Sequence, residues 1–452
     1  MIQLFLLFCG TRLVRKYWWV LFAFGFFWLC VGLFVMNDAV FSAHRIPVDY
    51  FAIPLCFDGI WALGTAFSKE GTTRKLRLSR AGIMLGVALL ILFAPRYHGV
   101  IIGIIIGTFI VADACFRIAS AYVVRFKRWQ FSLAFGVFEF LCGLWSLVPW
   151  PTYYAGAVGH DVGVLVMLGA MSVCGLSLRI RSLPSQVSIC TVFSKGWPEN
   201  YKVHEERRAH PRENGEEVIV HVWTPTEELA PLSVGRYVAA TNKSGVISTG
   251  HAAMEIKPDV YISFYPAVEI DRDNIEFMQS LNASDKNNVQ GLFQPSYEVE
   301  SADWCPSTMQ VRIRGLNTRN MRQFWNAYRE DITYNLTSRN CASSVAKALD
   351  AGLEGLFSKQ IRSSFFFLPH LFFTPEMWVA GFMRQRAEAM AWTPGILLDY
   401  VRALSYIMSL PGKWNPVAEG KKKNVAPGDS PAAASSFENK AHDGADTSQP
   451  QQ

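Results

Sequence analysis

The chain has 452 residues, of which 50% are hydrophobic and 18% are charged, and its formal net charge is +6. The hydrophobic residues concentrate in residues 17–179, whereas residues 195–345 mix charges, turn residues and short alternating runs as a soluble domain does. This uneven distribution excludes a single soluble globular domain, a disordered chain and a disulfide-linked secreted module, and the basic residues, which lie beside apolar segments, do not indicate a nucleic-acid partner.

Residues 1–182 are predicted to form a transmembrane domain of six helices. The run Met1–Gly10 lacks a basic N-terminal region and is too short for a signal peptide, so we expect it to lie at the membrane interface before the first span. A helix needs about 20 apolar residues to cross the hydrocarbon core. Six stretches approach this length: 17–36, 47–67, 81–96, 99–119, 129–148 and 159–179.

Lysine and arginine are distributed unequally between the two sides of these spans. One side has only Arg45 and Arg96. The other side has Arg12, Arg15, Lys16, Lys69, Arg74, Lys75, Arg77, Arg80, Arg125, Lys127, Arg128, Arg179 and Arg181. Positively charged flanks resist translocation. Both termini, and with them all residues after 180, are therefore predicted to be cytoplasmic.

Asp58 and Asp113 lie inside predicted spans. A carboxylate there costs about 2.5–3.5 kcal/mol on insertion scales, so each side chain is expected to face protein or water. Two interpretations stay open: a carboxylate linked to protons or to a ligand, or a hydrogen bond between helices.

The spans also carry recurring short motifs. The odd-numbered spans begin with Lys16-Tyr-Trp-Trp19, Arg80-Ala-Gly82 and Arg128-Trp129. The even-numbered spans contain Cys56-Phe-Asp58-Gly59, Val111-Ala-Asp113-Ala114 and Gly159-His-Asp161-Val162. This pattern resembles the HdeD-like acid-resistance membrane proteins over residues 12–182. The resemblance implies six spans arranged as three helical hairpins in a bacterial inner membrane.

After the spans, residues 183–216 are expected to be a polar linker, 217–411 a second domain, and 412–452 a disordered tail rich in Ala, Ser, Pro and Gln. The linker either lies near anionic headgroups or acts as a solubilising tether. Strands are predicted at 218–223, 248–256, 259–265 and 309–315, and a helix at about 318–330.

The segment Tyr334–Gly352 contains the first candidate catalytic residue. Asn340 is a suitable N-cap and Gly352 a suitable C-terminal stop, so Cys341 is predicted in the first turn of a helix. Unpaired N–H groups and the positive end of the helix dipole favour a thiolate at such a position. Cys341 is therefore a candidate nucleophile, although a cysteine by itself is also a common small buried hydrophobic residue.

His251 begins one predicted strand and Ser263 lies on the next. If these strands pair as a hairpin, His251 and Ser263 approach each other, and Cys341 can meet them from its helix. This set supplies a base, an orienting group and a nucleophile for thiol acyl transfer. A lone histidine is more often an ordinary core or surface residue, so the prediction depends on the three residues together.

The order of these residues resembles the circularly permuted papain-like hydrolases, which include permuted NlpC-type enzymes and the lecithin:retinol acyltransferase (LRAT) family. In these proteins the strand histidine precedes an Asn-Cys helix, as His251 precedes Asn340-Cys341 here. The resemblance covers about residues 217–352 and implies an α+β fold with an antiparallel sheet packed on the cysteine-bearing helix. Ser263 stands where the LRAT relatives usually have a second histidine.

The apolar segment 363–373 is too short and too interrupted by proline to be a seventh span. It could lie in the membrane interface, cover an acyl-binding groove or pack as an ordinary hydrophobic element. No two cysteines have the spacing of a metal site or a structural disulfide, and the histidines are scattered, so neither metal nor cofactor is expected. His221 is a weak candidate for the wall of the site.

These observations predict a membrane-anchored cysteine hydrolase or acyltransferase, with membrane lipids as partners and phospholipid acyl esters as the leading substrate. A cytoplasmic domain reaches the inner leaflet but not the periplasmic cell wall. The alternatives are an NlpC-type amidase or peptidase acting on peptidoglycan or protein, and a non-enzymatic acid-stress membrane protein with an inactive papain-like module. The sequence does not indicate an oligomeric state.

Overall fold

The computed structural model describes residues 1–40, 50, 52–67, 71–93, 98–125, 129–148, 153–184, 186–194, 196–202, 216–224, 240–241, 247–248, 250–268, 281–364 and 366–409. The predicted tail 412–452 and the central part of the predicted linker, 203–215, lie outside these ranges. So do the loop residues Arg45, Lys69, Arg96, Lys127 and Arg128.

The N-terminal region is helical at all six predicted spans. Its helices are α3 (Trp18–Val40), α4 (Ala52–Ala66), α5 (Gly71–Phe93), α6 (His98–Val124), α7 (Trp129–Leu147) and α8 (Tyr154–Ser182). Four segments are long and apolar enough to cross a membrane: Trp18–Ala39, Gly99–Val124, Trp129–Leu147 and Gly156–Ser182. The helix α4 is apolar but shorter, and α5 begins with several basic residues. These helices indicate a membrane protein.

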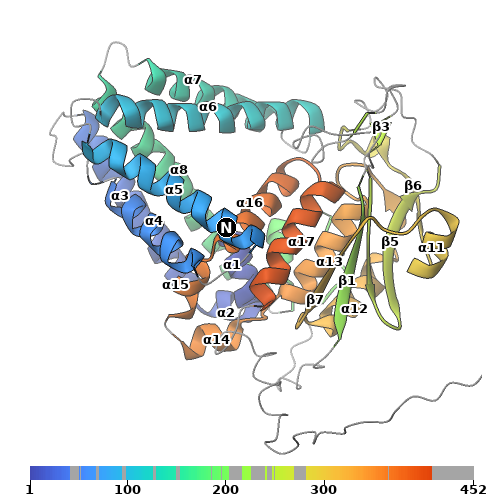
Figure 1. The fold of residues 1–452 in the computed structure, drawn as a ribbon. Helices are drawn as coiled ribbons and strands as arrows, with labels where there is room; N and C mark the ends of the chain where they lie inside the picture. Colours follow the sequence, from blue (N-terminus) through green and yellow to red (C-terminus); the bar gives the residue numbers. More distant parts are fainter. Residues whose placement is uncertain are drawn as a thin grey trace, which may run out of the picture.

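The helices of this region pack in antiparallel pairs, α3 with α8, α4 with α5 and α6 with α7 (Figure 1). Small residues allow close approach between the first and last helix. A Cβ atom added at Gly32 would lie 2.9 Å from the carbonyl oxygen of Gly163. The close pairs therefore join α3 to the last helix and leave α4–α5 and α6–α7 as two consecutive hairpins.

The two aspartates of the predicted spans are both paired with arginine. Asp58 accepts two hydrogen bonds from Arg80, at 2.9 and 2.5 Å. Asp113 forms ion pairs with Arg117 at 3.4 Å and with Arg386 of the C-terminal region at 2.8 Å. Charged partners offset the cost of placing a carboxylate in a span, so each aspartate faces protein, as the sequence predicts.

The C-terminal region contains a six-stranded antiparallel sheet with the order β7-β1-β4-β5-β6-β8. Its strands are β1 (Glu217–Trp223), β4 (His251–Ile256), β5 (Val260–Pro266), β6 (Val289–Phe293), β7 (Met309–Arg314) and β8 (Thr333–Tyr334). A separate pair is formed by β2 (Ala240–Thr241) and β3 (Ile247–Ser248). The four predicted strands are confirmed, with ends shifted by a few residues.

Helices cover both faces of this sheet. On one face lie α13 (Cys341–Leu353), which packs on β4 and β5, and α17 (Pro394–Ser409), which packs on β7, β1 and β4 (Figure 1). The short α11 (Tyr297–Asp303) contacts β5 through its side chains on the other face. The helix α12 (Thr318–Tyr328), predicted at 318–330, packs against α13, and a 3-10 turn, η4 (Asp285–Asn287), precedes β6.

The N-terminal segment, which we expected at the membrane interface, packs into the C-terminal region. It forms α1 (Ile2–Cys9) and α2 (Thr11–Lys16), and Leu4, Leu7 and Phe8 are buried in the main hydrophobic core of the C-terminal region. The amides of Gly355 and Phe357 donate to the carbonyl oxygens of Leu7 and Phe8. Because α1 is apolar on nearly every side, it is stabilised by burial within a protein core.

The beginning of the predicted linker also packs in this core. Residues 186–194 and 196–202 contain α9 (Cys190–Phe193), and Ile189, Cys190, Trp197 and Tyr201 are buried. Glu354, at the end of α13, accepts hydrogen bonds from Thr11 at 2.5 Å and from Ser188 at 2.6 Å. The helices α3 to α8 are thus inserted between two segments, 1–16 and 183–201, that pack with the C-terminal region.

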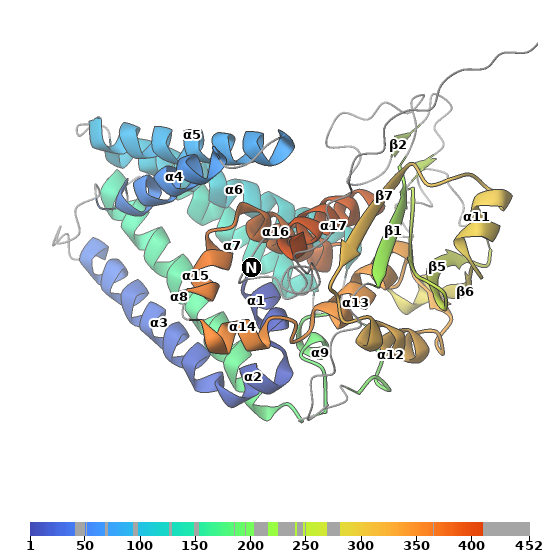
Figure 2. The ribbon, with the colours of Figure 1, turned by 60° about the horizontal axis from the view of Figure 1, so that its bottom comes forward.

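Three further helices follow α13: α14 (Ser358–Ser363), α15 (Phe367–Phe372) and α16 (Pro375–Ala389). Figures 1 and 2 show α16 and α17 between the membrane helices and the sheet. The helices α16 and α17 begin at Pro375 and Pro394, with proline in the first turn as helix starts allow.

Candidate active site

Cys341 is the first residue of α13, and local hydrogen bonds fix the turn before it. The Asn340 side chain accepts from the Ser343 amide, while the Ser343 hydroxyl accepts from the Asn340 amide, both at 2.8 Å. This reciprocal capping box satisfies two donors at the helix start. The side-chain NH₂ group of Asn340 also donates to the backbone carbonyl oxygens of Leu336 and Trp392. The predicted N-cap is confirmed, and Cys341 is held in the first turn with 8% of its surface exposed.

His251 is the first residue of β4 and follows Gly250, which has a positive φ of 71°. The pairing of Ala253 with Ser263 places His251 and Ser263 on one face of the sheet. The His251 Nε2 atom lies 2.9 Å from Ser263 Oγ. The Tyr265 ring stacks on the imidazole with ring centroids 4.0 Å apart, so its orientation is fixed from the side as well.

A carboxylate that we did not predict completes this group. Glu300 lies on α11, and its Oε1 atom is 3.2 Å from His251 Nε2. Glu300 also accepts hydrogen bonds from the hydroxyl groups of Tyr261 and Tyr265, the second at 2.7 Å. Burial raises the pKa of both tyrosines, as does the nearby carboxylate, so their hydroxyl groups stay protonated and donate.

The electrostatics of the group favour a charged pair. Burial acts to raise the pKa of Glu300, but hydrogen bonds from His251, Tyr261 and Tyr265 lower it to about 2. Burial acts to lower the pKa of His251, but the charge and hydrogen bonding of Cys341 and Glu300 raise it to about 9. At neutral pH Glu300 is therefore ionised and His251 is protonated.

The structure thus brings the three predicted residues together. Ser263 lies within hydrogen-bonding distance of His251, and Cys341 is close enough for its sulfur to raise the pKa of the imidazole. All three are buried. Their catalytic roles stay a prediction. The His251 Nε2 atom has two neighbours, the neutral hydroxyl of Ser263 and the charged carboxylate of Glu300.

The sequence contains a signal for Glu300 that our prediction did not use. Tyr261 and Tyr265 flank Ser263 at alternate positions of β5, so their rings point to the His251 face. Buried tyrosine hydroxyls need an acceptor. Ser296, whose hydroxyl accepts from the Val299 amide, starts a short helix that presents Glu300 to them. This cap narrows the choice to the two acidic residues of the first turn, Glu298 and Glu300.

His221, the weak candidate for the wall of the site, lies in a second buried group on the same face. Its Nδ1 atom is 3.1 Å from Ser307 Oγ, and its ring stacks on Tyr297 with ring centroids 3.9 Å apart. Glu255 lies 3.5 Å from His221 Nε2. Burial lowers the pKa of His221 to about 4, so it is neutral at neutral pH. His221 contacts Trp223, which in turn packs on His251.

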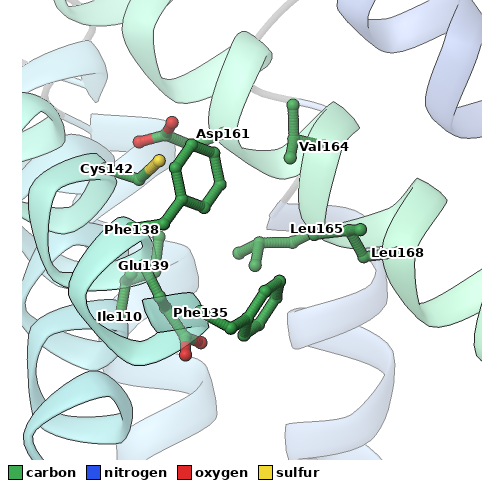
Figure 3. A pocket seen from close by; sticks show the side chains of 9 residues that line it. All are labelled: Ile110, Phe135, Phe138, Glu139, Cys142, Asp161, Val164, Leu165 and Leu168. Atoms are coloured by element: carbon green, nitrogen blue, oxygen red, sulfur yellow. The ribbon is translucent and has the colours of Figure 1, made fainter. Parts of the chain in front are cut away.

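A small pocket lies elsewhere, among the membrane helices α6, α7 and α8 (Figure 3). Its lining is mostly apolar and includes the acidic residues Glu139 and Asp161. Both acids have partners, because Arg117 donates to Glu139 at 2.8 Å and the Ser146 hydroxyl donates to Asp161. The pocket contains no residue of the His251 group, so the two features are separate.

Comparison with known proteins gives one partial match. A family model for the IcsB middle domain matches residues 270–374. This range contains Glu300 and Cys341 but ends short of His251 and Ser263 on the N-terminal side. No curated protein and no solved structure matches the chain. The chain is therefore similar to the IcsB middle domain over the segment that carries the candidate nucleophile and the carboxylate.

Proposed function

We propose that the protein is a membrane-anchored cysteine acyl hydrolase or acyltransferase in which Cys341, His251 and Glu300 act together. The observation that carries this proposal is the position of His251, which interacts with a helix-start cysteine and with a buried, ionised glutamate. A nucleophile, a base and a group that orients the base form the arrangement that covalent acyl transfer requires.

The reaction follows from these positions. His251 Nε2 contacts Ser263 and Glu300, which leaves Nδ1 for the thiol. His251 is protonated at neutral pH, so the Cys341 sulfur attacks the acyl carbonyl as a thiolate whose proton is already held by His251. His251 then returns a proton to the leaving alcohol or amine, and a thioester forms on Cys341. Water or another acceptor, deprotonated by His251, attacks the thioester and releases the free thiol.

The developing oxyanion needs donors close to Cys341. The amide of Cys341 is at the start of α13, where N–H groups have no carbonyl one turn earlier. The Asn340 side chain is engaged on both its oxygen and its nitrogen by structural hydrogen bonds. We therefore assign the amide of Cys341 as one donor and exclude the Asn340 side chain as the other.

The proposal includes the permuted papain-like fold for residues 217–411 and six HdeD-like spans for residues 1–182. The packing of residues 1–16 with the C-terminal region supports an even number of crossings, because both ends of the membrane region must lie on one side. The excess of lysine and arginine on that side makes it the cytoplasmic side of a bacterial inner membrane.

A catalytic domain in this position reaches lipids of the inner leaflet, so phospholipid acyl esters are the proposed substrate. Incubation of the full-length protein with phospholipid vesicles should release fatty acid or lysolipid. The Cys341→Ala variant should be inactive, with a loss of about 10³-fold or more. Cys305→Ala is the matched control, since it removes a thiol outside the His251 group and keeps the backbone carbonyl that accepts from the Trp223 indole N–H.

Other outcomes separate the alternatives. Release of peptides from peptidoglycan or protein, with intact lipids, would establish the amidase or peptidase instead. The inactive-module hypothesis was motivated by the missing second histidine, but Glu300 supplies a carboxylate to His251. If Cys341 reacts with iodoacetamide at neutral pH no faster than Cys305, that hypothesis replaces the enzymatic one.

A further inference from the structure

The surface of α15 and of the first three turns of α16 differs from that of a water-soluble domain. Between residues 366 and 384 every exposed side chain is apolar: Phe366, Leu368, Pro369, Phe372, Trp378 and Phe382. Phe366 is 71% exposed and Phe382 is 52% exposed. The charged residues in this stretch, Glu376 and Arg384, are both buried. A soluble domain facing water would carry its charges on the outside and its aromatic residues inside.

This apolar surface continues that of the membrane helices. The Phe373 ring lies 5.6 Å from the rings of Phe57 and Trp61, measured between centroids, and both are exposed residues of α4. The Arg80 guanidinium, which pairs with Asp58, lies over the Trp378 ring. The aromatic residues of α15 and α16 and those of α4 therefore form one surface.

Contacts with α6 place α16 at the depth of a span. Arg386 pairs with Asp113 at 2.8 Å, and the Ser120 hydroxyl donates to the Ala389 carbonyl at 2.9 Å. Both partners lie in the apolar segment Gly99–Val124. At about 1.5 Å per residue, Asp113 is roughly 16 Å along the helix from Val124, which is about half of a hydrocarbon core of ~30 Å.

The opposite face of α16 belongs to the C-terminal domain. Arg384 pairs with Asp350 of α13 at 2.7 Å, and both side chains are almost fully buried. Met377 and Ala380 belong to the main hydrophobic core. Just after α16, the Trp392 carbonyl accepts from Asn340, the N-cap of α13. One helix therefore contacts the membrane region, the exposed apolar surface and the helix that starts at Cys341.

From these contacts, we propose that α15 and α16 insert into the bilayer beside α4 and α6 and that their exposed apolar side chains contact lipid acyl chains. The C-terminal domain is then a partly membrane-embedded domain that holds the start of α13 close to lipid. The occupant of the surface is lipid because the surface is continuous with the apolar face of the membrane helices and has no exposed charge between residues 366 and 384.

The test uses a photoreactive benzophenone amino acid placed at Phe366, Phe372 or Phe382 of the full-length protein in native membranes. Irradiation should give phospholipid adducts at all three positions, detected by mass spectrometry. Phe109, which is exposed on α6, is the positive control. The exposed residues Val268 and Leu292, on the sheet side of the domain, are matched negative controls.

Three results would overturn the proposal. They are adducts at Phe109 but not at Phe366 and Phe382, adducts to a second copy of the chain or to another protein at these positions, and equal lipid labelling at Val268 and Leu292. The measurement is repeated in the Cys341→Ala variant, where the same adducts are expected. The crosslinking result therefore tests membrane insertion separately from the proposed catalytic activity, and either proposal can fail without the other.

Discussion

Two buried histidines lie on the same face of the sheet, and each has a glutamate beside it, yet their pKa values move in opposite directions. The pKa of His251 is raised to about 9, and the pKa of His221 is lowered to about 4. Both side chains are nearly inaccessible, with residue exposures of 4% and 1%. Burial lowers the pKa of each imidazole, so it does not account for the difference.

The difference comes first from Cys341, whose charge and hydrogen bonding raise the pKa of His251 and do not act on His221, and then from the glutamates. Glu300 receives hydrogen bonds from two tyrosine hydroxyls and from His251, so its pKa falls to about 2 and its charge is retained. Burial raises the pKa of Glu255, which lies at 3.5 Å from His221 without such donors. Hydrogen bonds to an ionised carboxylate favour its charged form, and the charged form in turn favours a neighbouring imidazolium. Cys341, together with the tyrosines of β5 that keep Glu300 charged, thus distinguishes the candidate catalytic histidine from its neighbour.

The largest effect is expected when the charge of Glu300 is removed. Glu300→Gln keeps the shape but loses the charge that stabilises the imidazolium, so kcat/KM at pH 7 should fall by about 100-fold or more. Steady-state kinetics of acyl release provide the measurement. Glu298→Gln is the control on the same helix, because Glu298 is exposed and pairs only with Lys257 among the described ion pairs. If Glu300→Gln keeps wild-type activity, as the control Glu298→Gln should, the charge of Glu300 has no role in catalysis.

The pH dependence of acylation should follow His251. Because its folded pKa is raised to about 9, the imidazole is protonated below that value and can donate to the leaving group. The acylation rate should decline by about tenfold per pH unit above 9. In Glu300→Gln the decline should begin at lower pH. Rapid-mixing kinetics test this, and a rate that stays constant up to pH 10 in the wild type would contradict the assigned role.

A smaller effect is expected at Ser263. Ser263→Ala removes a neutral hydrogen bond to His251, which contributes on the order of 1 kcal/mol, or about fivefold in rate. Thermal unfolding of the same variant shows whether the fold is intact. A loss as large as that of Glu300→Gln in a folded protein would mean that Ser263, rather than Glu300, orients the imidazole.

The smallest effect is expected at His221. His221→Gln removes a neutral side chain that contacts Ser307 and Tyr297, so activity should change by less than about threefold. In a histidine-selective NMR titration, the variant should lack the His221 resonance that titrates near pH 4 and keep the His251 resonance that titrates near pH 9. A much larger loss of activity would assign His221 to the catalytic group and end the distinction between the two histidines.

Local features of the site could be predicted from the sequence. The position of Cys341 depends on a cap that reaches only from Asn340 to Ser343, and such short-range bonds are encoded in adjacent residues. The hairpin of β4 and β5 brings His251 and Ser263 together for the same reason. The carboxylate was missed because Glu300 meets His251 across 49 positions of sequence, through a helix that the strand pattern did not reveal.

The architecture divides in the same way. Hydropathy predicts the membrane helices because each span is set by its own apolar length. It could not show that α1 and residues 186–202 belong to the C-terminal core, since an apolar segment indicates that burial is needed but not which partner provides it. The sequence by itself determined the apolar helices, four strands and the candidate nucleophile, whose causes lie within a few residues. Only the tertiary structure decided the partner of His251 and the place of α1 and α16, because contacts between distant segments depend on how the whole chain packs.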